Sequence, residues 1–404
     1  MFVRKKYIEQ LLRYKDLPIA KAIVGIRRSG KSNIVIQYID HLIENLNIDK
    51  KQIIYIDFED FSNENLLNAK NLFDFLNDKI NKFKNNKKIY IFLDEIQKVE
   101  KFESIISTFY KKTNIDLYIT GSNSFLLDNK RSTLLTGRTI PIYVFPFSFK
   151  EFYQNYHKDK ISHYESFDLY LKFGGMPFVS FLNFQENEIN QYISSIDSDI
   201  LVKDIAYSLF EKKINVNNVL LTNIKKYIYT QCGNSTSVNS IRNNLKQNNI
   251  TIYNELLEEI IESFCNSFQL YKVNRYDLKG NLILKTDYKY YVNDHSFRNI
   301  FLSNYKENLG FLLENIVYFE LLRRDYIVYI GKNNRNEIDF IAIKNDEKIY
   351  IQVTKEININ NQKREIDNLS NASGATKKIL LSLDEEEKFV ESIYYKNLIK
   401  WLLE

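Results

Sequence analysis

The sequence predicts an α/β protein in which a doubly wound parallel sheet is followed by further domains with other patterns. Over residues 1–150, short runs of consecutive apolar residues alternate with segments whose apolar residues recur at helical spacing. This alternation is typical of parallel strands covered by helices on both faces. After residue 150 the sequence becomes rich in helical patterns and then mixed. A length of 404 residues suits about two to four domains.

Five segments of the first 150 residues are expected to be strands. Each is short, apolar and rich in Ile, Val, Leu or Tyr, as buried strands are. They are residues 19–24, 53–57, 89–93, 116–120 and 139–144. The segments between them are expected to be helices, because parallel strands need long crossover connections.

Residues 25–32 read Gly-Ile-Arg-Arg-Ser-Gly-Lys-Ser and lie between the first expected strand and the first expected helix. A glycine-rich loop in this position binds phosphate, because the free N–H groups and the dipole at the helix start attract anions. Lys31 would contact the β- and γ-phosphates, and the Ser32 hydroxyl would ligate magnesium. The residues expected to contact nucleotide are Gly25, Arg28, Ser29, Gly30, Lys31, Ser32 and Asn33. The loop therefore predicts binding of a nucleoside triphosphate with magnesium.

Asp94 and Glu95 directly follow the third expected strand. Their place at its carboxyl end matches a Walker B motif with a catalytic carboxylate. Asp94 would hold magnesium through water, and Glu95 would orient and deprotonate the attacking water. An acidic turn is the alternative for this pair alone, but its combination with the loop at 25–32 favours the catalytic interpretation. Because a kinase would have to exclude this water, Glu95 favours hydrolysis.

Composition indicates a cytoplasmic protein. No apolar run approaches the roughly 18 to 20 residues that span a bilayer, and residues 1–7 lack the apolar core of a signal peptide. Cys232 and Cys265 are the two cysteines, too few for a disulfide framework or a zinc site. The net charge of +5 is small for 404 residues, so charge alone does not indicate a nucleic-acid-binding protein.

The motifs resemble those of a known family, the prokaryotic AAA-type P-loop ATPases of the AAA_14 type, which are STAND-like and carry a DUF4143-type C-terminal region. In that family the phosphate-binding loop reads G-x-R-R-x-G-K-[ST], as residues 25–32 do. Further landmarks follow in the family's order at residues 93–97, 120–124, 137–138, 146–152 and 174–177. The resemblance implies a P-loop NTPase core at 1–150, a helical lid at 151–212, a winged-helix domain at 213–300 and an α/β nuclease-like domain at 301–404.

The resemblance also implies roles for residues outside the loop. Ser122 or Asn123 would sense the γ-phosphate. Arg138 would act as an arginine finger across a subunit boundary, and Pro177 of the lid would lie against adenine. Plain structural roles are the alternatives: a helix cap for Ser122, a surface salt bridge for Arg138 and a helix break at Pro177. For the loop arginines the alternative is an ion pair beyond the second strand, with Asp57, Glu59 or Asp60.

The expected winged-helix domain has three helices and then two strands, residues 268–275 and 282–289, which would form the wing. Its candidate recognition helix is acidic. This helix, residues 252–264, carries no Lys or Arg but four carboxylates: Glu255, Glu258, Glu259 and Glu262. Carboxylates that face DNA phosphates would be repelled. We therefore expect a protein contact here rather than DNA binding.

The last hundred residues resemble the restriction-endonuclease fold. In working members, an Asp and a Glu or Gln on two strands bind magnesium, while a Lys two residues after the second orients water. Asp339 and Gln352 match the first two positions, and Glu314 fits the acid on the preceding helix. Thr354 stands where the lysine is expected, and Lys355 faces the other side of the strand. We expect a degenerate domain in which Asp339 and Gln352 form a vestigial metal site.

Together these features predict a magnesium-dependent ATPase that uses ATP to switch between conformations. One alternative is an ATP-gated DNA nuclease acting through the last two domains. Another is a slow nucleotide-binding switch or scaffold for a protein partner. ATP is the expected ligand and an unidentified protein the expected partner; DNA is not favoured, no membrane is involved, and an oligomer is left open.

Overall fold

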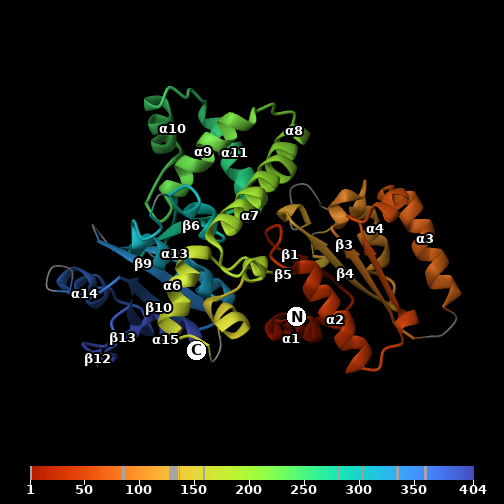
Figure 1. Cartoon of the computed structure of the whole chain (residues 1–404), viewed down its shortest axis with the longest axis horizontal. Helices are drawn as coiled ribbons and strands as arrows, with labels where there is room; N and C mark the ends of the chain where they lie inside the picture. The colour runs from red at the N-terminus through yellow and green to blue at the C-terminus, as the bar shows by residue number, and fades with distance from the viewer. Residues whose placement is uncertain are drawn as a thin grey trace. The chain divides into compact units, whose positions relative to one another are not determined.

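The structure of the chain is a computed structural model that describes residues 2–83, 87–126, 135, 137–157, 160–280, 282–302, 304–333, 336–358 and 362–404. The chain forms two compact units: Met1–Phe145 with Asn266–Phe268, and Pro146–Cys265 with Gln269–Glu404. Figure 1 shows the elements of each unit. None of the helices in the described ranges combines the length and the apolar character that a bilayer crossing requires.

The first unit contains a parallel sheet of five strands in the order β2-β3-β4-β1-β5. The strands are β1 (Ala20–Val24), β2 (Ile53–Asp57), β3 (Ile89–Asp94), β4 (Ile115–Gly121) and β5 (Thr139–Tyr143). Each expected strand is present with its ends within one residue of the prediction. The predicted α/β class with a parallel sheet is therefore confirmed.

Helices cover both faces of this sheet (Figure 1). They are α1 (Lys5–Tyr14), α2 (Lys31–Glu44), α3 (Ala69–Lys82) and α4 (Phe102–Phe109), with short 3-10 helices η1 (Lys50–Gln52), η2 (Phe61–Leu67), η3 (Ile96–Lys98) and η4 (Ser124–Leu126). From β1 the chain crosses to β2 at the edge of the sheet, and it then returns across the sheet through β3 to β4. Because crossovers between parallel strands are right-handed, the helix α2 of the first step lies on one face of the sheet, and α3 and α4 of the return lie on the opposite face.

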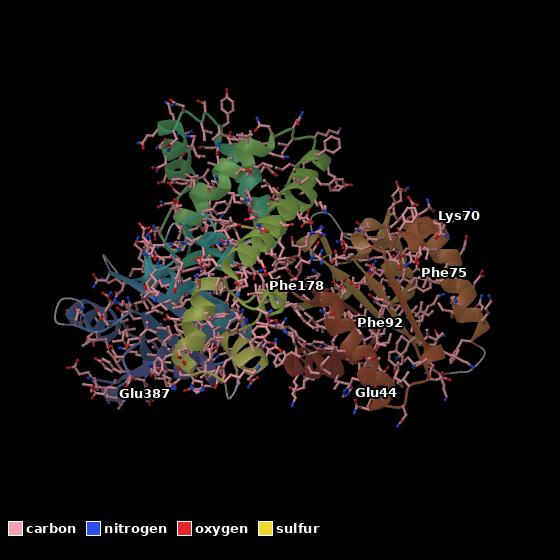
Figure 2. The ribbon with its side chains drawn as sticks, viewed as in Figure 1. Glu44, Lys70, Phe75, Phe92, Phe178 and Glu387 are labelled. Carbon is pink, nitrogen blue, oxygen red and sulfur yellow. The ribbon has the colours of Figure 1, made fainter. Side chains whose placement is uncertain are left out.

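Apolar residues at helical spacing anchor α2 to the sheet. Ile34 and Tyr38 are completely buried and pack against strand residues of the same core. The Tyr38 ring lies 5.3 Å from that of Tyr118, which stacks on Phe92 at 4.6 Å. Phe92 is among the side chains labelled in Figure 2. This packing fixes the start of α2 next to the carboxyl ends of the strands.

The second unit begins with helices, as expected for residues 151–212. They are α5 (Phe149–Phe152), η5 (Tyr153–His157), α6 (His163–Phe173), η6 (Pro177–Leu182), α7 (Glu186–Asp199), η7 (Ile200–Ala206) and α8 (Tyr207–Glu211). The break after α6 needs its two glycines. A Cβ on Gly174 would lie 2.0 Å from Asp294 Oδ1, and one on Gly175 would lie 2.2 Å from the Phe147 carbonyl oxygen. The Gly175 N–H donates to the Asp294 carboxylate at 2.7 Å, so this landmark motif is a close backbone packing site.

Further helices follow along the second unit: α9 (Asn218–Thr230), α10 (Val238–Gln247), α11 (Asn254–Asn266), α12 (Ser296–Asn299), α13 (Leu309–Arg323), α14 (Gln362–Ser370) and α15 (Leu398–Leu403). The helix α13 is buried on most of its circumference. Its Tyr318 ring stacks on Tyr291 at 4.7 Å, which ties the helix to the sheet of this unit.

Eight strands of the second unit form one sheet in the order β12-β13-β11-β10-β9-β8-β6-β7. They are β6 (Leu270–Asp277), β7 (Leu282–Val292), β8 (Ile327–Asn333), β9 (Asn336–Lys344), β10 (Glu347–Val353), β11 (Lys377–Ser382), β12 (Lys388–Val390) and β13 (Ile393–Asn397). The hairpin β6–β7, expected as the wing of a winged helix, pairs through β6 with β8. The boundary expected at residue 300 therefore falls inside one continuous sheet.

Candidate nucleotide site

The loop at residues 25–32 connects β1 to α2 and leaves the start of α2 open. Gly30 adopts φ 96° and ψ 22° before the helix, and within the described chain no side chain caps this end. At Gly25 a Cβ would lie 2.1 Å from the carbonyl oxygen of Val144, so only glycine allows this close approach. The open helix end supplies backbone N–H groups and a positive partial charge. This geometry suits a phosphate group.

Lys31 and Glu95, the two residues expected to do most of the chemistry, touch one another. The Lys31 ammonium lies 3.4 Å from Glu95 Oε1 and donates to the carbonyl oxygens of Gly25 and Ile26 at 3.1 and 3.3 Å. Burial opposes ionisation of Glu95, but the charge of Lys31 and a hydrogen bond from Gln97 hold its pKa below the usual value. Glu95 is therefore an ionised carboxylate at neutral pH and the counter-ion of Lys31.

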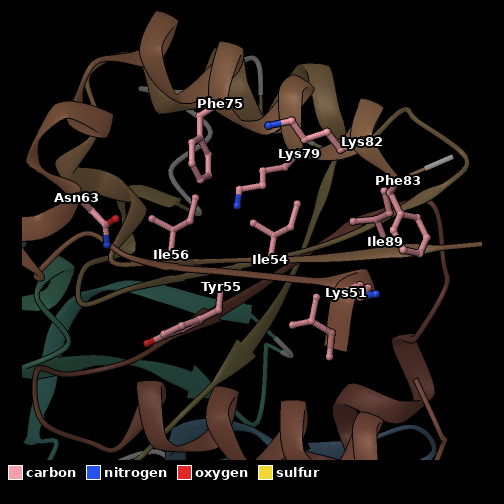
Figure 3. A pocket seen from close by; sticks show the side chains of 11 residues that line it. Lys51, Ile54, Tyr55, Ile56, Asn63, Phe75, Lys79, Lys82, Phe83 and Ile89 are labelled. Carbon is pink, nitrogen blue, oxygen red and sulfur yellow. The ribbon is translucent and has the colours of Figure 1, made fainter. Parts of the chain in front are cut away.

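Asp94 is held by two hydroxyl groups that the sequence did not indicate. Tyr55 donates to Asp94 Oδ2 at 3.0 Å, and Thr120 donates to Oδ1. The same Thr120 oxygen accepts the backbone N–H of Glu95 at 2.8 Å. Tyr55 points away from Ile54 and Ile56, as strand alternation requires (Figure 3). Thr120 therefore fixes both acidic residues at once, and it lies at the end of the strand next to theirs.

The polar atoms of the site fit a magnesium–triphosphate. Asp94 is almost fully buried, and its side-chain oxygens have further lone pairs for a water bound to the metal. Ser32 is the second residue of α2, directly after Lys31. The hydroxyls of Ser29 and Ser122 are buried without a hydrogen-bond partner in the described chain. Unsatisfied buried hydroxyls need an explanation, and phosphate oxygens would satisfy both.

Ser122 and Asn123 follow β4 at the edge where the loop begins. Gly121 is opposite Val24, the residue before Gly25, and both Ser122 and Asn123 are buried. Their position is compatible with the expected contact to the γ-phosphate. That role stays a prediction for both residues.

Arg138 lies at the opposite edge of the sheet. Its carbonyl accepts the N–H of Ala20 at 3.0 Å, and its neighbour Thr139 pairs with Ala20, the first residue of β1. The loop begins after Val24, so four residues of strand, roughly 13 Å, separate the two positions. The guanidinium carbon lies 5.8 Å from the ring centre of Tyr110. Arg138 does not reach the loop of its own chain, and its expected action across a subunit boundary stays a prediction.

The two loop arginines differ in their surroundings. Arg27 lies 3.4 Å from Glu59 and is partly buried, which matches the expected ion pair beyond the second strand. Arg28 is exposed with a φ of 67°. Its contact with phosphate stays a prediction. Pro177 belongs to the second unit, where its carbonyl accepts the hydroxyl of Tyr156 at 2.7 Å, and its contact with adenine also stays a prediction.

Arg4 holds the backbone of the loop at residues 25–32, a role that the sequence does not predict. Its Nη1 donates to the carbonyl oxygens of Ser29 at 3.2 Å and Phe145 at 2.9 Å. Its guanidinium also lies 4.5 Å from the ring centre of Tyr7. The side chain is nearly fully buried. Arg4 thus joins the loop to the segment after β5, and no sequence signal distinguishes it from the lysines that follow.

A cavity of about 470 Å³ lies between β2 and α3, away from the loop. Ile54 and Ile56 of β2 face Phe75, Lys79 and the rest of α3 across it (Figure 3). The strands β3 and β4 separate β2 from β1 in the sheet. This cavity is therefore distinct from the nucleotide site.

In the second unit, the predicted vestigial metal residues lie close together. The Asp339 N–H donates to Gln352 Oε1 at 3.3 Å, and Asp339 Oδ2 accepts the N–H of Val353 at 2.8 Å. Burial, and then the charge of Glu314, raise the pKa of Asp339 well above its usual range. Glu314 is also buried, and its pKa is raised by that burial. The three residues predicted from the tail are thus assembled around one buried region.

Lys289 of β7 lies at the same place and was not expected there. Its ammonium lies 3.2 Å from Glu314 and 2.8 Å from Glu337. Although burial opposes it, the neighbouring carboxylates raise the pKa of Lys289, so this lysine is charged. Among the described residues, no group of three or more His, Cys, Asp or Glu side chains has the arrangement of a metal site. The vestigial metal site predicted at Asp339 and Gln352 stays a prediction.

The acidic helix of the expected winged-helix domain corresponds to α11. Glu255, Glu258 and Glu262 are exposed, and Glu259 pairs with Lys212. The helix thus presents carboxylates to solvent. Neither a DNA nor a protein partner is shown for it.

Two family matches and three related proteins place the chain among known sequences. Residues 18–153 match the AAA domain family, and residues 164–308 match a domain family of unknown function, DUF8612. An uncharacterized protein of Haemophilus influenzae is 34% identical over 407 aligned residues, which cover 100% of this chain and 99% of that protein. An uncharacterized protein of Methanocaldococcus jannaschii is 29% identical over 384 aligned residues, which cover 90% of this chain and 81% of that protein.

Among solved structures, a Walker-type ATPase of Pyrococcus abyssi has a similar fold. The TM-score is 0.51 at 14% sequence identity, and the likeness covers 74% of this chain and 96% of that chain. This likeness shows a similar fold, and the AAA match supports a P-loop ATPase domain that binds nucleotide. The match at 164–308 does not show the DUF4143-type, winged-helix or nuclease-like region that the sequence predicts.

Proposed function

The chain, whose residues 18–153 match the AAA domain family, belongs to the same family as its Haemophilus influenzae relative, and on this premise we propose that it is a magnesium-dependent ATPase. The contact of Lys31 with Glu95 is the observation that carries the proposal. It brings the phosphate-binding lysine and the expected base to the open end of α2. A phosphate-binding helix end, a lysine and two carboxylates are the parts that phosphoryl transfer to water requires.

In the proposed complex, the phosphates lie against the start of α2 and contact Lys31. Magnesium would be held by the Ser32 hydroxyl and, through water, by Asp94, and it would neutralise phosphate charge. Tyr55 and Thr120 keep the Asp94 carboxylate in one orientation. The residues of this chain thus supply positioning and electrostatic stabilisation, which are the main contributions in phosphoryl transfer.

Glu95 would take the proton of the attacking water. While Lys31 is its counter-ion, the lowered pKa makes Glu95 a weak base. When Lys31 turns to phosphate oxygens, Glu95 loses this positive charge, and its burial then favours proton uptake. ATP binding would therefore activate the base that hydrolyses ATP. The same exchange of partners is a local change from which the proposed conformational switch can start.

The test compares ATP binding and steady-state hydrolysis in the parent and three variants. Lys31→Ala should weaken binding, whereas Glu95→Gln should retain binding and lose about 10² to 10⁴ in turnover. Glu64→Gln is the matched control, because Glu64 is an exposed acid of η2 that lies outside the loop and outside the pair Asp94–Glu95. Its turnover should equal that of the parent. Equal turnover in Glu95→Gln would remove Glu95 from the mechanism, and a parent that binds but does not hydrolyse ATP would support the slow switch or scaffold.

Arg138 is proposed to act on a nucleotide bound by another copy of the chain. Arginine fingers contribute about 10³ to 10⁵ in rate, so Arg138→Ala should slow turnover with little change in ATP affinity. Mixing it with Lys31→Ala protein should restore part of the activity, because each variant supplies what the other lacks. Failure of this mixture, with turnover per chain independent of protein concentration, would contradict action in trans and the implied oligomer.

For the C-terminal region we propose a scaffolding role towards a protein partner rather than DNA cleavage. Two observations support this: Lys289 pairs with the carboxylates Glu314 and Glu337 in the cluster around Asp339, and α11 presents carboxylates where a DNA-binding helix would need cations. Plasmid nicking with magnesium and with manganese tests this. Nicking by the parent that disappears in Asp339→Ala would establish the ATP-gated nuclease instead.

A further inference from the structure

Lys289 reaches into a cluster formed by the carboxyl groups of Glu314, Glu337 and Asp339 in the second unit. It does so from a strand outside the nuclease-like domain predicted at 301–404. It lies on β7, opposite Val273 of β6, in the hairpin that extends the sheet beyond β8. Only 3% of the residue is exposed. Its ammonium lies 2.8 Å from Glu337 Oε1 on β9 and 3.2 Å from Glu314 Oε2 on α13. One side chain thus joins a helix and two separate parts of the sheet.

Two further side chains bond to the carboxylates that Lys289 contacts. Tyr291 donates to Glu314 at 3.2 Å, and Arg275 donates to Glu337 at 2.8 Å. On the neighbouring strands, Asp339 Oδ2 and Gln352 Oε1 accept backbone N–H groups. Carboxylates that are already paired and hydrogen-bonded need no further cation.

A divalent cation and the Lys289 ammonium would compete for the same carboxylates. Magnesium and manganese sites bring oxygen ligands to roughly 2.0 to 2.2 Å, whereas the ammonium approaches Glu314 and Glu337 to ordinary hydrogen-bond distances. Two like charges about 4 Å apart repel by about 4 kcal/mol even at an effective dielectric constant of 20. The cluster can therefore hold the ammonium or the metal ion, but not both at full occupancy.

We propose that the Lys289 ammonium takes the place of a divalent cation in this cluster. It links Glu314 to Glu337 as a metal ion would, but it is covalently part of the chain. The second unit would then be assembled without metal. With the ammonium in place, these described carboxylates do not have the arrangement of a metal site. Removal of the ammonium should let Glu314, Glu337 and Asp339 move together around a cation. This inference is independent of the ATPase proposal, which concerns the first unit.

The experiment measures Mn²⁺ binding to the full-length, nucleotide-free chain by electron paramagnetic resonance. All proteins carry Asp94→Asn to remove any contribution of the nucleotide site. The background protein should bind no Mn²⁺ at this cluster, and Lys289→Gln should gain one Mn²⁺ per chain. Lys289→Arg is the matched control, because it retains the charge and should gain none. Adding Asp339→Asn to Lys289→Gln should abolish the gained site.

Thermal unfolding with and without Mn²⁺ keeps the test decisive if Lys289→Gln folds poorly. The background protein should show the same melting temperature with Mn²⁺ and with EDTA. Lys289→Gln should melt lower, and Mn²⁺ should raise its melting temperature by several degrees. Mn²⁺ bound by the background protein and lost on Asp339→Asn would overturn the proposal. So would a Lys289→Gln protein, folded or not, that neither binds nor is stabilised by Mn²⁺.

Discussion

Replacing Thr120 by Val should remove the hydroxyl group that holds both Asp94 and Glu95 in position. The Thr120 hydroxyl donates to Asp94 and accepts the Glu95 N–H at 2.8 Å, and valine offers neither bond. Loss of a hydrogen bond to a charged group costs about 1.5–3 kcal/mol, and a buried N–H without a partner about 1–3 kcal/mol. The sum of roughly 2.5–6 kcal/mol is a large part of the free energy of unfolding of a typical domain, which is about 5–15 kcal/mol. We therefore expect a lower melting temperature and, because small misplacements of catalytic groups cost about 10² in rate, a similar loss in kcat.

The assay is steady-state ATP hydrolysis, with ATP affinity measured by isothermal titration calorimetry. Affinity should change little, because the contacts of Lys31 and the loop do not involve Thr120. Thr120→Ser is the control, since it retains the hydroxyl and should keep kcat within a few fold of the parent. Equal kcat values for Thr120→Val and Thr120→Ser would refute the idea that this hydroxyl positions the carboxylates.

Three further outcomes test other contacts. Glu95→Gln should bind ATP about 10-fold more tightly or better, a gain of at least about 1.4 kcal/mol in binding free energy. The reason is that Lys31 no longer has to leave a charged partner to reach phosphate. Unchanged affinity in calorimetry would contradict the exchange in which Lys31 leaves Glu95 for phosphate. Arg4→Met should weaken ATP binding and lower the melting temperature, because its guanidinium anchors the loop backbone, whereas Arg13→Met on the exposed face of α1 should do neither. Burial lowers the pKa of His295 below its ordinary 6.5, so below about pH 6.5 the unfolded chain binds a proton that the folded chain does not, and stability should fall as pH falls. His295→Asn should therefore flatten the melting temperature between pH 7 and 5, and a slope equal to that of the parent would rule this contribution out.

Contiguous features made much of the first unit predictable from the sequence. The five strands are runs of apolar residues, and burial on both faces of a parallel sheet requires such runs. The loop at 25–32 and the pair Asp94–Glu95 are each continuous in the chain. Because both lie at carboxyl ends of strands, their meeting follows from the parallel direction of the sheet alone. The contact between Lys31 and Glu95 is the result.

Contacts that depend on strand order or on distant segments were not predictable. Tyr55 and Thr120 reach Asp94 because β2 and β4 flank β3, which no local pattern reveals. Arg138 directly precedes β5, and only the pairing of Thr139 with Ala20 shows that it lies at the edge of the sheet opposite the phosphate-binding loop. Lys289 was assigned to a wing because a hairpin after three helices matches that pattern. Its strand instead continues the neighbouring sheet, which places it beside Glu314.

The continuous sheet of the second unit restricts how the protein can be divided into fragments. A fragment that begins at residue 301 would lose β6 and β7 and expose the edge of β8 over residues that now pair with β6. Unpaired strand edges promote association with other chains, and the carboxylates Glu314 and Glu337 would be left without their lysine. Expression of the C-terminal region by itself should therefore yield aggregating material when it starts at 301. Starting before β6, at residue 269, would keep the sheet whole, and starting at residue 146 would also keep the hydrogen bond of Gly175 to Asp294 and with it the second unit.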